Sequence, residues 1–216
     1  MNRITTGNSR SRQPAEPRTL PSTRFGAGRR FSWLMVVTGG LGLLASAVIW
    51  TDSIRLAEDP AFQPACNVGS VLSCTDVMRS DQASLFGLPN PLFGLVAYAV
   101  VVAGGIALLA GARFPRWCWI GLNLGGFAGA VFCMWLMGQA LYSIGALCLW
   151  CCLTWAVTIA LFWYSLVHSL GHRIIPAPRA WVRGVQEFHW AVPVTWYAVV
   201  VLLIAMRFRP AWQSMI

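Results

Sequence analysis

Five long apolar stretches constrain the fold of this chain more than any other feature. They cover roughly residues 31–51, 91–111, 117–138, 147–168 and 190–206, and the last is the shortest. About 20 apolar residues in a helix are enough to cross the hydrocarbon core of a bilayer. The chain is 57% hydrophobic and 11% charged, whereas soluble domains carry about 25% charged residues. We therefore exclude an ordinary soluble fold and predict an all-α integral membrane protein.

The charge of the chain is strongly positive but is not that of a nucleic-acid-binding protein. The net charge is +9, and all 16 basic residues are arginines that flank the apolar stretches. They lie mainly before the first stretch, between the second and third, and between the fourth and fifth. Cytoplasmic segments carry such an excess of arginine. We expect a cytoplasmic N-terminus, the 52–90 and 139–146 loops on the outer side, and no nucleic-acid partner. Arg207 and Arg209 would be mild exceptions.

The stretches divide the chain into expected regions. Residues 1–30 read as a disordered, Arg-rich cytoplasmic tail, and the stretch from Phe31 is longer than the apolar part of a signal peptide. Residues 171–189 read as a cytoplasmic loop, and residues 190–216 as a fifth transmembrane helix with a short C-terminus. The outer loop 52–90 is long enough to suggest a function of its own, and a short amphipathic helix could form around Val71–Met78.

Four cysteines form two pairs at the outer ends of these stretches. Cys66 and Cys74, the loop pair, lie in the 52–90 loop, and Cys148 and Cys151, the helix pair, open the fourth stretch. Residues three apart share a helix face, and a helix N-terminus favours the reactive thiolate. Cys148 should exchange disulfides with the loop pair, while Cys151 lies about 5 Å deeper. This arrangement predicts a relay of electrons from protein thiols to an acceptor dissolved in the bilayer.

Less reactive interpretations exist for the same cysteines. The helix pair could be two small buried residues, and the loop pair a structural disulfide, which does not exclude exchange. Zinc binding is disfavoured because the spacing of the loop pair does not match that of a zinc knuckle. A transporter is disfavoured because the apolar stretches hold almost no ionisable residues. Three further cysteines are expected to take no part in the chemistry: Cys118, Cys133 and Cys152.

The motifs resemble those of a known family. Cys66-Asn-Val-Gly-Ser-Val-Leu-Ser-Cys74, Phe86-Gly87, Asn90-Pro-Leu-Phe-Gly94 and Cys148-Leu-Trp-Cys151 are similar to those of bacterial homologues of vitamin K epoxide reductase. The resemblance covers about residues 31–170. It implies a catalytic four-helix transmembrane bundle around a quinone site, to which this chain adds a fifth transmembrane helix.

The resemblance also implies roles for individual residues. Cys66 would react first with the partner, Cys74 would form a transient disulfide with Cys148, and Cys151 would contact the quinone. Asn90 would donate a hydrogen bond to a quinone carbonyl, although from the residues alone it could be a turn residue. The quinone would be menaquinone or ubiquinone. The partner would be a separate DsbA-like protein of the thioredoxin fold, since the chain ends soon after the fifth stretch.

One position departs from the family pattern. Trp155 stands where the family often has a tyrosine, four residues after the motif. Its N–H could donate to a carbonyl, and Phe93, Trp135 and Trp155 could line a flat pocket or could serve only in packing. The expected function is a thiol–quinone oxidoreductase of the bacterial inner membrane that forms disulfides outside the cytoplasm. The alternatives are a non-catalytic scaffold with a structural loop disulfide and an enzyme acting on vitamin K epoxide.

Overall fold

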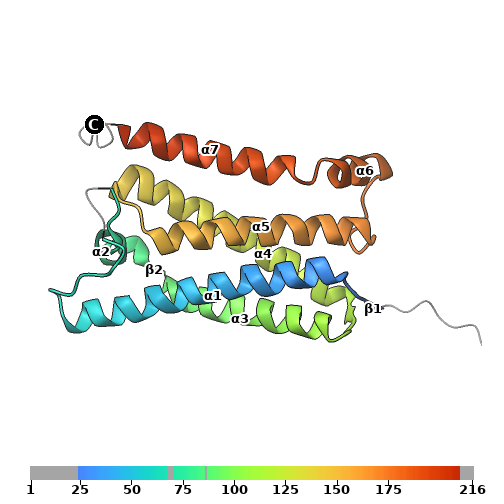
Figure 1. The fold of residues 1–216 in the computed structure, drawn as a ribbon, viewed down its shortest axis with the longest axis horizontal. Coiled ribbons are helices and arrows are strands. Elements are labelled where there is room, and N and C mark those ends of the chain that lie inside the picture. Colours follow the sequence, from blue (N-terminus) through green and yellow to red (C-terminus); the bar gives the residue numbers. More distant parts are fainter. Residues whose placement is uncertain (1–23, 68–70, 86, 210–216) are drawn as a thin grey trace, which may run out of the picture.

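The computed structural model describes residues 24–67, 71–85 and 87–209 as a bundle of long helices lying side by side (Figure 1). The helices are α1 (Arg29–Glu58), α2 (Cys74–Arg79), α3 (Asn90–Leu109), α4 (Arg116–Gly138), α5 (Leu149–Gly171), α6 (Arg179–Glu187) and α7 (Ala191–Arg207). Two single turns complete the helical structure, η1 (Asp81–Ala83) and the π-helical η2 (Gln139–Ile144). Two short antiparallel pairings join β1 (Arg24–Phe25) to β4 (Phe114–Pro115) and β2 (Ser84–Leu85) to β3 (Leu88–Pro89).

Four of these helices are long and apolar enough to cross a membrane. They are α1, α3, α4 together with η2, and α5, with 30, 20, 29 and 23 residues. The 17-residue α7 meets the same criterion only together with α6, from which it is bent by 59°. The predicted all-α membrane protein is therefore confirmed, and the fifth apolar stretch forms a helix where one was expected.

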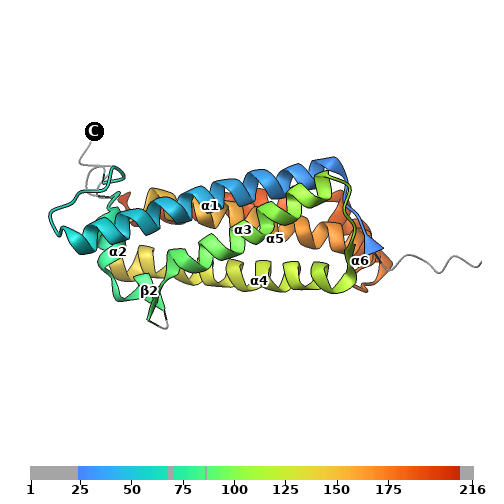
Figure 2. The ribbon, with the colours of Figure 1, turned by 90° about the horizontal axis from the view of Figure 1, so that it is seen from below.

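The helices of the bundle pack closely where small residues meet. Helix α1 packs along α3 and α5, and α4 packs along α5 (Figures 1 and 2). A Cβ atom added to Gly39 of α1 would lie 2.9 Å from a methyl group of Val102 in α3. On α4, Gly126 and Gly129 face Phe162 and Thr158 of α5. Small residues at such interfaces let helix backbones approach each other in lipid.

The two ends of the bundle differ in structure. One end, here called the α2 end, carries α2, the β2–β3 pairing and η2, and the opposite α6 end carries β1, β4 and α6 (Figure 1). All four cysteines of the two pairs belong to the α2 end. Helix α7 is fastened there by Arg207, whose Nε donates to the carbonyl of Leu141 over 2.8 Å.

Several expected regions differ from the observed elements. Residues 1–23 of the expected disordered tail and residues 210–216 lie outside the described residues, but Arg24–Phe25 pair with Phe114–Pro115 as β1 and β4. The expected loop 171–189 contains the helix α6, which was missed because it is short and only half apolar. The short helix expected around Val71–Met78 begins later, at Cys74.

Candidate active site

The structure brings the two cysteine pairs into one buried cluster. Cys66 and Cys74 are joined by a disulfide, with a Cα–Cα distance of 5.9 Å. The Sγ atom of Cys74 lies 3.3 Å from the Sγ atom of Cys148. Cys148 is 1% exposed and Cys74 is fully buried, and the cluster is packed against Val77, Met78, Trp150 and Cys151. Residues far apart in the chain therefore meet at a separation suited to thiol–disulfide exchange.

The position of Cys74 is set by the residue that follows Cys66. The side-chain oxygen of Asn67 accepts hydrogen bonds from the backbone N–H groups of Cys74 (2.8 Å) and Thr75 (3.3 Å). Its amide nitrogen donates to Thr75 Oγ1 over 2.7 Å. Ser73, the N-cap residue of α2, accepts from the N–H of Asp76. Asn67 and Ser73 thus satisfy the free N–H groups at the start of α2 and hold Cys74 in its first turn.

The position of Cys148 is set by backbone pairing with the loop. The N–H of Leu147 donates to the carbonyl of Val71 over 2.9 Å, and the N–H of Ser73 donates to the carbonyl of Leu147 over 3.0 Å. This parallel bridge fastens the segment before Cys74 to the segment before Cys148. Gly145 enables the preceding turn, because its φ of 73° is a left-handed conformation that suits glycine.

The local environment favours a thiolate at Cys148. Cys148 is the N-cap of α5, and its sulfur accepts the backbone N–H of Cys151 over 3.4 Å. Hydrogen bonds from the Cys151 thiol and from the backbone N–H groups of Cys151 and Trp150 lower the pKa of Cys148 below its ordinary value. Burial and the charge of Asp52 oppose this shift. Because the thiolate is the nucleophile in disulfide exchange, Cys148 is the more reactive sulfur of the helix pair.

A large apolar cavity lies beneath the sulfur cluster. Its volume is about 720 Å³, and its walls come from α1, α3, α4 and α5. Cys148 and Cys151 both line it, as do Asn90, Phe93 and Trp155. The helix pair therefore faces the loop disulfide on one side and this cavity on the other.

Two polar atoms in the cavity wall have no protein partner. The Nε1 atom of Trp155 and the Oδ1 atom of Asn90 are buried and form no hydrogen bond to any described residue. The Nδ2 atom of Asn90 donates to the carbonyl of Gln82 over 2.6 Å. An unpaired buried polar group carries a free-energy penalty, so the Trp155 N–H suits an oxygen acceptor on a ligand, whereas Asn90 Oδ1 suits a hydrogen-bond donor.

One predicted pocket residue lies elsewhere. Trp135 is 41% exposed, its ring stacks on that of Phe132, and it does not belong to the cavity wall, although Leu136 does. Successive helical residues are rotated by about 100°, which turns Trp135 away from the cavity that Leu136 faces. Of the three aromatic residues expected there, only Phe93 and Trp155 line the cavity.

Other residues at the site were absent from the sequence-based prediction. Ser73 had a recognisable signal, because a serine directly before a short helix is typical of an N-cap, whereas Asn67, seven residues before Cys74, had none. The pairing of Leu147 with the loop had none, since a single backbone bridge leaves no sequence pattern. Tyr98 lines the cavity, and its hydroxyl lies 2.5 Å from Thr158 Oγ1, which supplies the partner that a buried tyrosine needs.

The three remaining cysteines lie outside the buried sulfur cluster. Cys118 and Cys133 line the cavity wall, and Cys152 packs in an apolar cluster with Trp155 and Leu147. All three are free thiols.

Comparison with known proteins identifies the family. The family model described as "Vitamin K epoxide reductase family" matches residues 33–166, a range that contains both cysteine pairs. The mouse protein (Mus musculus) "Vitamin K epoxide reductase complex subunit 1" is 29% identical over 133 residues, which cover 54% of this chain and 77% of the mouse protein. Because the family match spans more than half of the chain, the protein belongs to the vitamin K epoxide reductase family.

Proposed function

We propose that this protein is a membrane thiol–quinone oxidoreductase that drives disulfide formation. Electrons would pass from a partner's thiols through the loop pair to the helix pair and then to a quinone. The observation that carries this proposal is the 3.3 Å separation between the sulfurs of Cys74 and Cys148. This sulfur–sulfur contact lies at the edge of an apolar cavity that both Cys148 and Cys151 line.

Each transfer within the protein is a thiol–disulfide exchange. A dithiol partner reduces the loop pair and leaves with a disulfide of its own. The Cys74 thiolate then attacks the Cys148–Cys151 disulfide at Cys148, which forms a Cys74–Cys148 bond and releases Cys151 as a thiolate. Cys66 attacks Cys74, restores the loop disulfide and releases Cys148. A loop disulfide beside a free Cys148 and a free Cys151 corresponds to the product of this sequence.

The helix pair would then give two electrons and two protons to a quinone and return to its disulfide form. The unpartnered Nε1–H of Trp155 would donate to one quinone carbonyl. Asn90 would bind the other carbonyl through the Nδ2 hydrogen that Gln82 does not use. Phe93 offers an apolar surface in the same wall. Menaquinone and ubiquinone both combine a flat ring with a lipid-soluble hydrocarbon tail, which such an apolar cavity suits.

We further propose the orientation and the partner. The arginines that flank the helices support a cytoplasmic α6 end and an α2 end facing outward. Disulfides persist outside the cytoplasm, so the loop pair would meet a DsbA-like thioredoxin-fold protein on the outer side of a bacterial inner membrane. Its oxidation would then supply disulfides to secreted proteins.

Anaerobic quinone reduction by the purified protein tests this function. The donor is a reduced thioredoxin-fold protein, and the wild type is compared with single alanine variants of Cys66, Cys74, Cys148 and Cys151. Turnover should need all four cysteines, and a small dithiol should rescue only the loop-pair variants. Cys152→Ala is the matched control and should retain turnover.

Two outcomes would contradict the proposal. If the Cys151→Ala variant reduces quinone as the wild type does, the relay is wrong. If no variant or wild-type sample turns over with any quinone or donor, the loop disulfide is structural and the protein is a scaffold. Because the mouse relative carries the name of an epoxide reductase, vitamin K epoxide belongs in the assay as an alternative acceptor.

A further inference from the structure

Helix α6 is a short amphipathic helix that takes no part in the proposed relay. At about 100° per residue, Arg179, Arg183 and Glu187 fall on one side of the helix. Trp181 and Val185 fall on the other side. Trp181 is 75% exposed. A large exposed aromatic side chain on the side opposite the arginines is typical of amphipathic helices that lie at a membrane surface.

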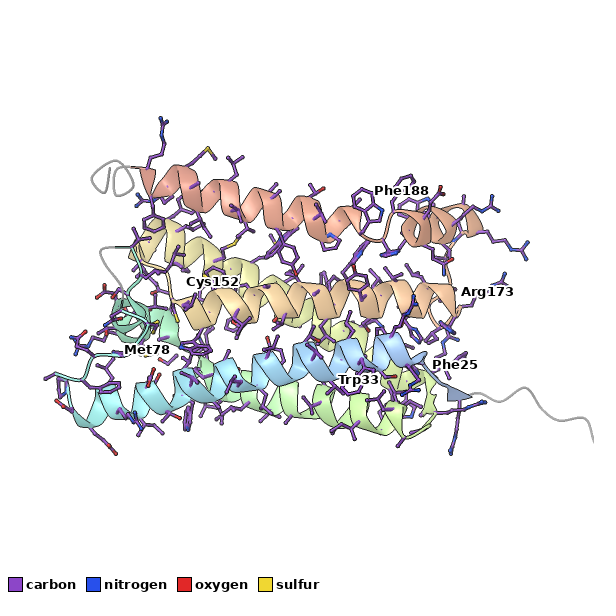
Figure 3. All side chains as sticks on the ribbon, in the orientation of Figure 1. Phe25, Trp33, Met78, Cys152, Arg173 and Phe188 are labelled. Atoms are coloured by element: carbon purple, nitrogen blue, oxygen red, sulfur yellow. A yellow bond between two sulfur atoms is a disulfide. The ribbon has the colours of Figure 1, made fainter. Side chains whose placement is uncertain are left out.

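The geometry of α6 suits such a location. Its axis is bent by 59° from that of α7, so α6 would be inclined toward the plane of any membrane that α7 crossed (Figure 1). Val182 and Val185 are half-buried, where α6 packs against α5. Phe188, directly after the helix, is 57% exposed. It lies near the junction of α6 and α7, on the same end of the bundle as Arg173 (Figure 3).

The charge around α6 has one sign. The α6 end carries a single acidic residue among the described positions, Glu187, against eight arginines. These are Arg24, Arg29, Arg30, Arg113, Arg116, Arg173, Arg179 and Arg183. The opposite end is mixed, since its four arginines face five acids. The α6 end is therefore complementary to an anionic surface.

We propose that α6 is an interfacial anchor that binds anionic phospholipid headgroups. Arg179 and Arg183 would contact the lipid phosphates, and Trp181 and Phe188 would insert between the headgroups and the acyl chains. Aromatic residues favour this depth in the bilayer, and basic residues beside a membrane are drawn to its anionic lipids. The exposed aromatic side chains lie where the chain leaves the membrane, so lipid is the partner that they would meet.

Hydrogen exchange of the full-length protein in nanodiscs tests the anchor. One set of nanodiscs contains phosphatidylcholine alone, and the other contains equal parts of phosphatidylcholine and phosphatidylglycerol. Exchange of the α6 amides should be slower in the anionic set. The Arg179→Gln/Arg183→Gln variant should lose most of this difference. One basic residue contributes about 1 kcal/mol beside an anionic surface, so the extra protection factor of the α6 amides in anionic nanodiscs should fall about fivefold per arginine and roughly 25-fold for the pair.

A matched variant controls for total charge. Arg55→Gln/Arg209→Gln removes two arginines from the α2 end and should leave exchange in α6 unchanged. Raising the salt concentration should shrink the lipid effect, since screening weakens exposed charge interactions. Equal α6 exchange in the two wild-type nanodiscs would overturn the proposal without any variant. A full lipid effect in the Arg179→Gln/Arg183→Gln variant would also overturn it, and protection that persists in detergent would indicate protein packing instead.

Discussion

Replacing Asn67 with alanine should weaken the contact between the two cysteine pairs without touching any sulfur. The Asn67 side chain accepts two backbone N–H groups at the start of α2, those of Cys74 and Thr75. Each such hydrogen bond contributes about 1 kcal/mol net. Loss of both therefore removes about 2 kcal/mol from the arrangement that holds Cys74 beside Cys148, which corresponds to roughly a 30-fold change in an equilibrium constant.

The equilibrium of the Cys74–Cys148 disulfide measures this effect. In a Cys66→Ala/Cys151→Ala background these are the only two relay cysteines left, and their disulfide can be titrated with a glutathione redox buffer. Peptide mass spectrometry identifies the bond. Adding Asn67→Ala should lower the equilibrium constant for disulfide formation by about 5- to 30-fold, the range given by one to two lost hydrogen bonds.

Asn67→Asp is the matched control for this measurement. It retains an oxygen that accepts both N–H groups and adds a negative charge at a helix N-terminus, which is favourable. It should stay close to the parent. The reasoning is refuted if Asn67→Ala also matches the parent, because Cys74 would then be held beside Cys148 by other contacts.

Three further outcomes are expected. Trp155→Phe should raise KM for the quinone about fivefold through loss of one hydrogen bond, whereas Trp135→Phe, outside the cavity, should leave KM unchanged in the same assay. Cys148 should reach half its maximal rate of reaction with a small thiol reagent at a lower pH than a cysteine in an unstructured peptide, because its pKa is lowered. A rate profile centred at or above that of the peptide cysteine would contradict the assignment. Gly39→Ala should lower the free energy of unfolding by about 1–3 kcal/mol through overpacking, and with it the melting temperature, since its Cβ would lie 2.9 Å from a side chain of α3. Gly40→Ala, where the Cβ meets nothing within 4 Å, should leave the melting temperature equal or higher.

The helices were predictable because their signal is local. A run of apolar residues that crosses a bilayer must form a helix whatever surrounds it, since its backbone groups have no other hydrogen-bonding partners there. The four main helices accordingly lie where the apolar stretches predicted them. The start of α3 at Asn90, followed by Pro91, also follows from local chemistry, because proline suits the first helical positions.

The site was predictable only in part. The cysteine spacing indicated which sulfurs could react, and their positions at the ends of the apolar stretches predicted that they share one end of the bundle. Their reactive roles remain a prediction, but the structure places Cys74 and Cys148 together. Trp135, which we expected in the pocket, lies outside the cavity wall, and this shows what a sequence pattern leaves undetermined. Whether an aromatic residue faces a cavity or lipid depends on helix rotation, and in a helix that is apolar all round the sequence pattern does not encode that rotation.

By itself, the sequence determined that this protein is a helical membrane protein with two cysteine pairs and an arginine-rich side. Those properties depend on hydropathy, spacing and charge, which are local or summed quantities. The family resemblance implied that Cys74 meets Cys148, but the tertiary structure alone decided that Asn67 and the pairing of Leu147 hold these two cysteines together beside an apolar cavity. The contact between Cys74 and Cys148 joins segments more than 70 positions apart, and its geometry is set by how the helices pack.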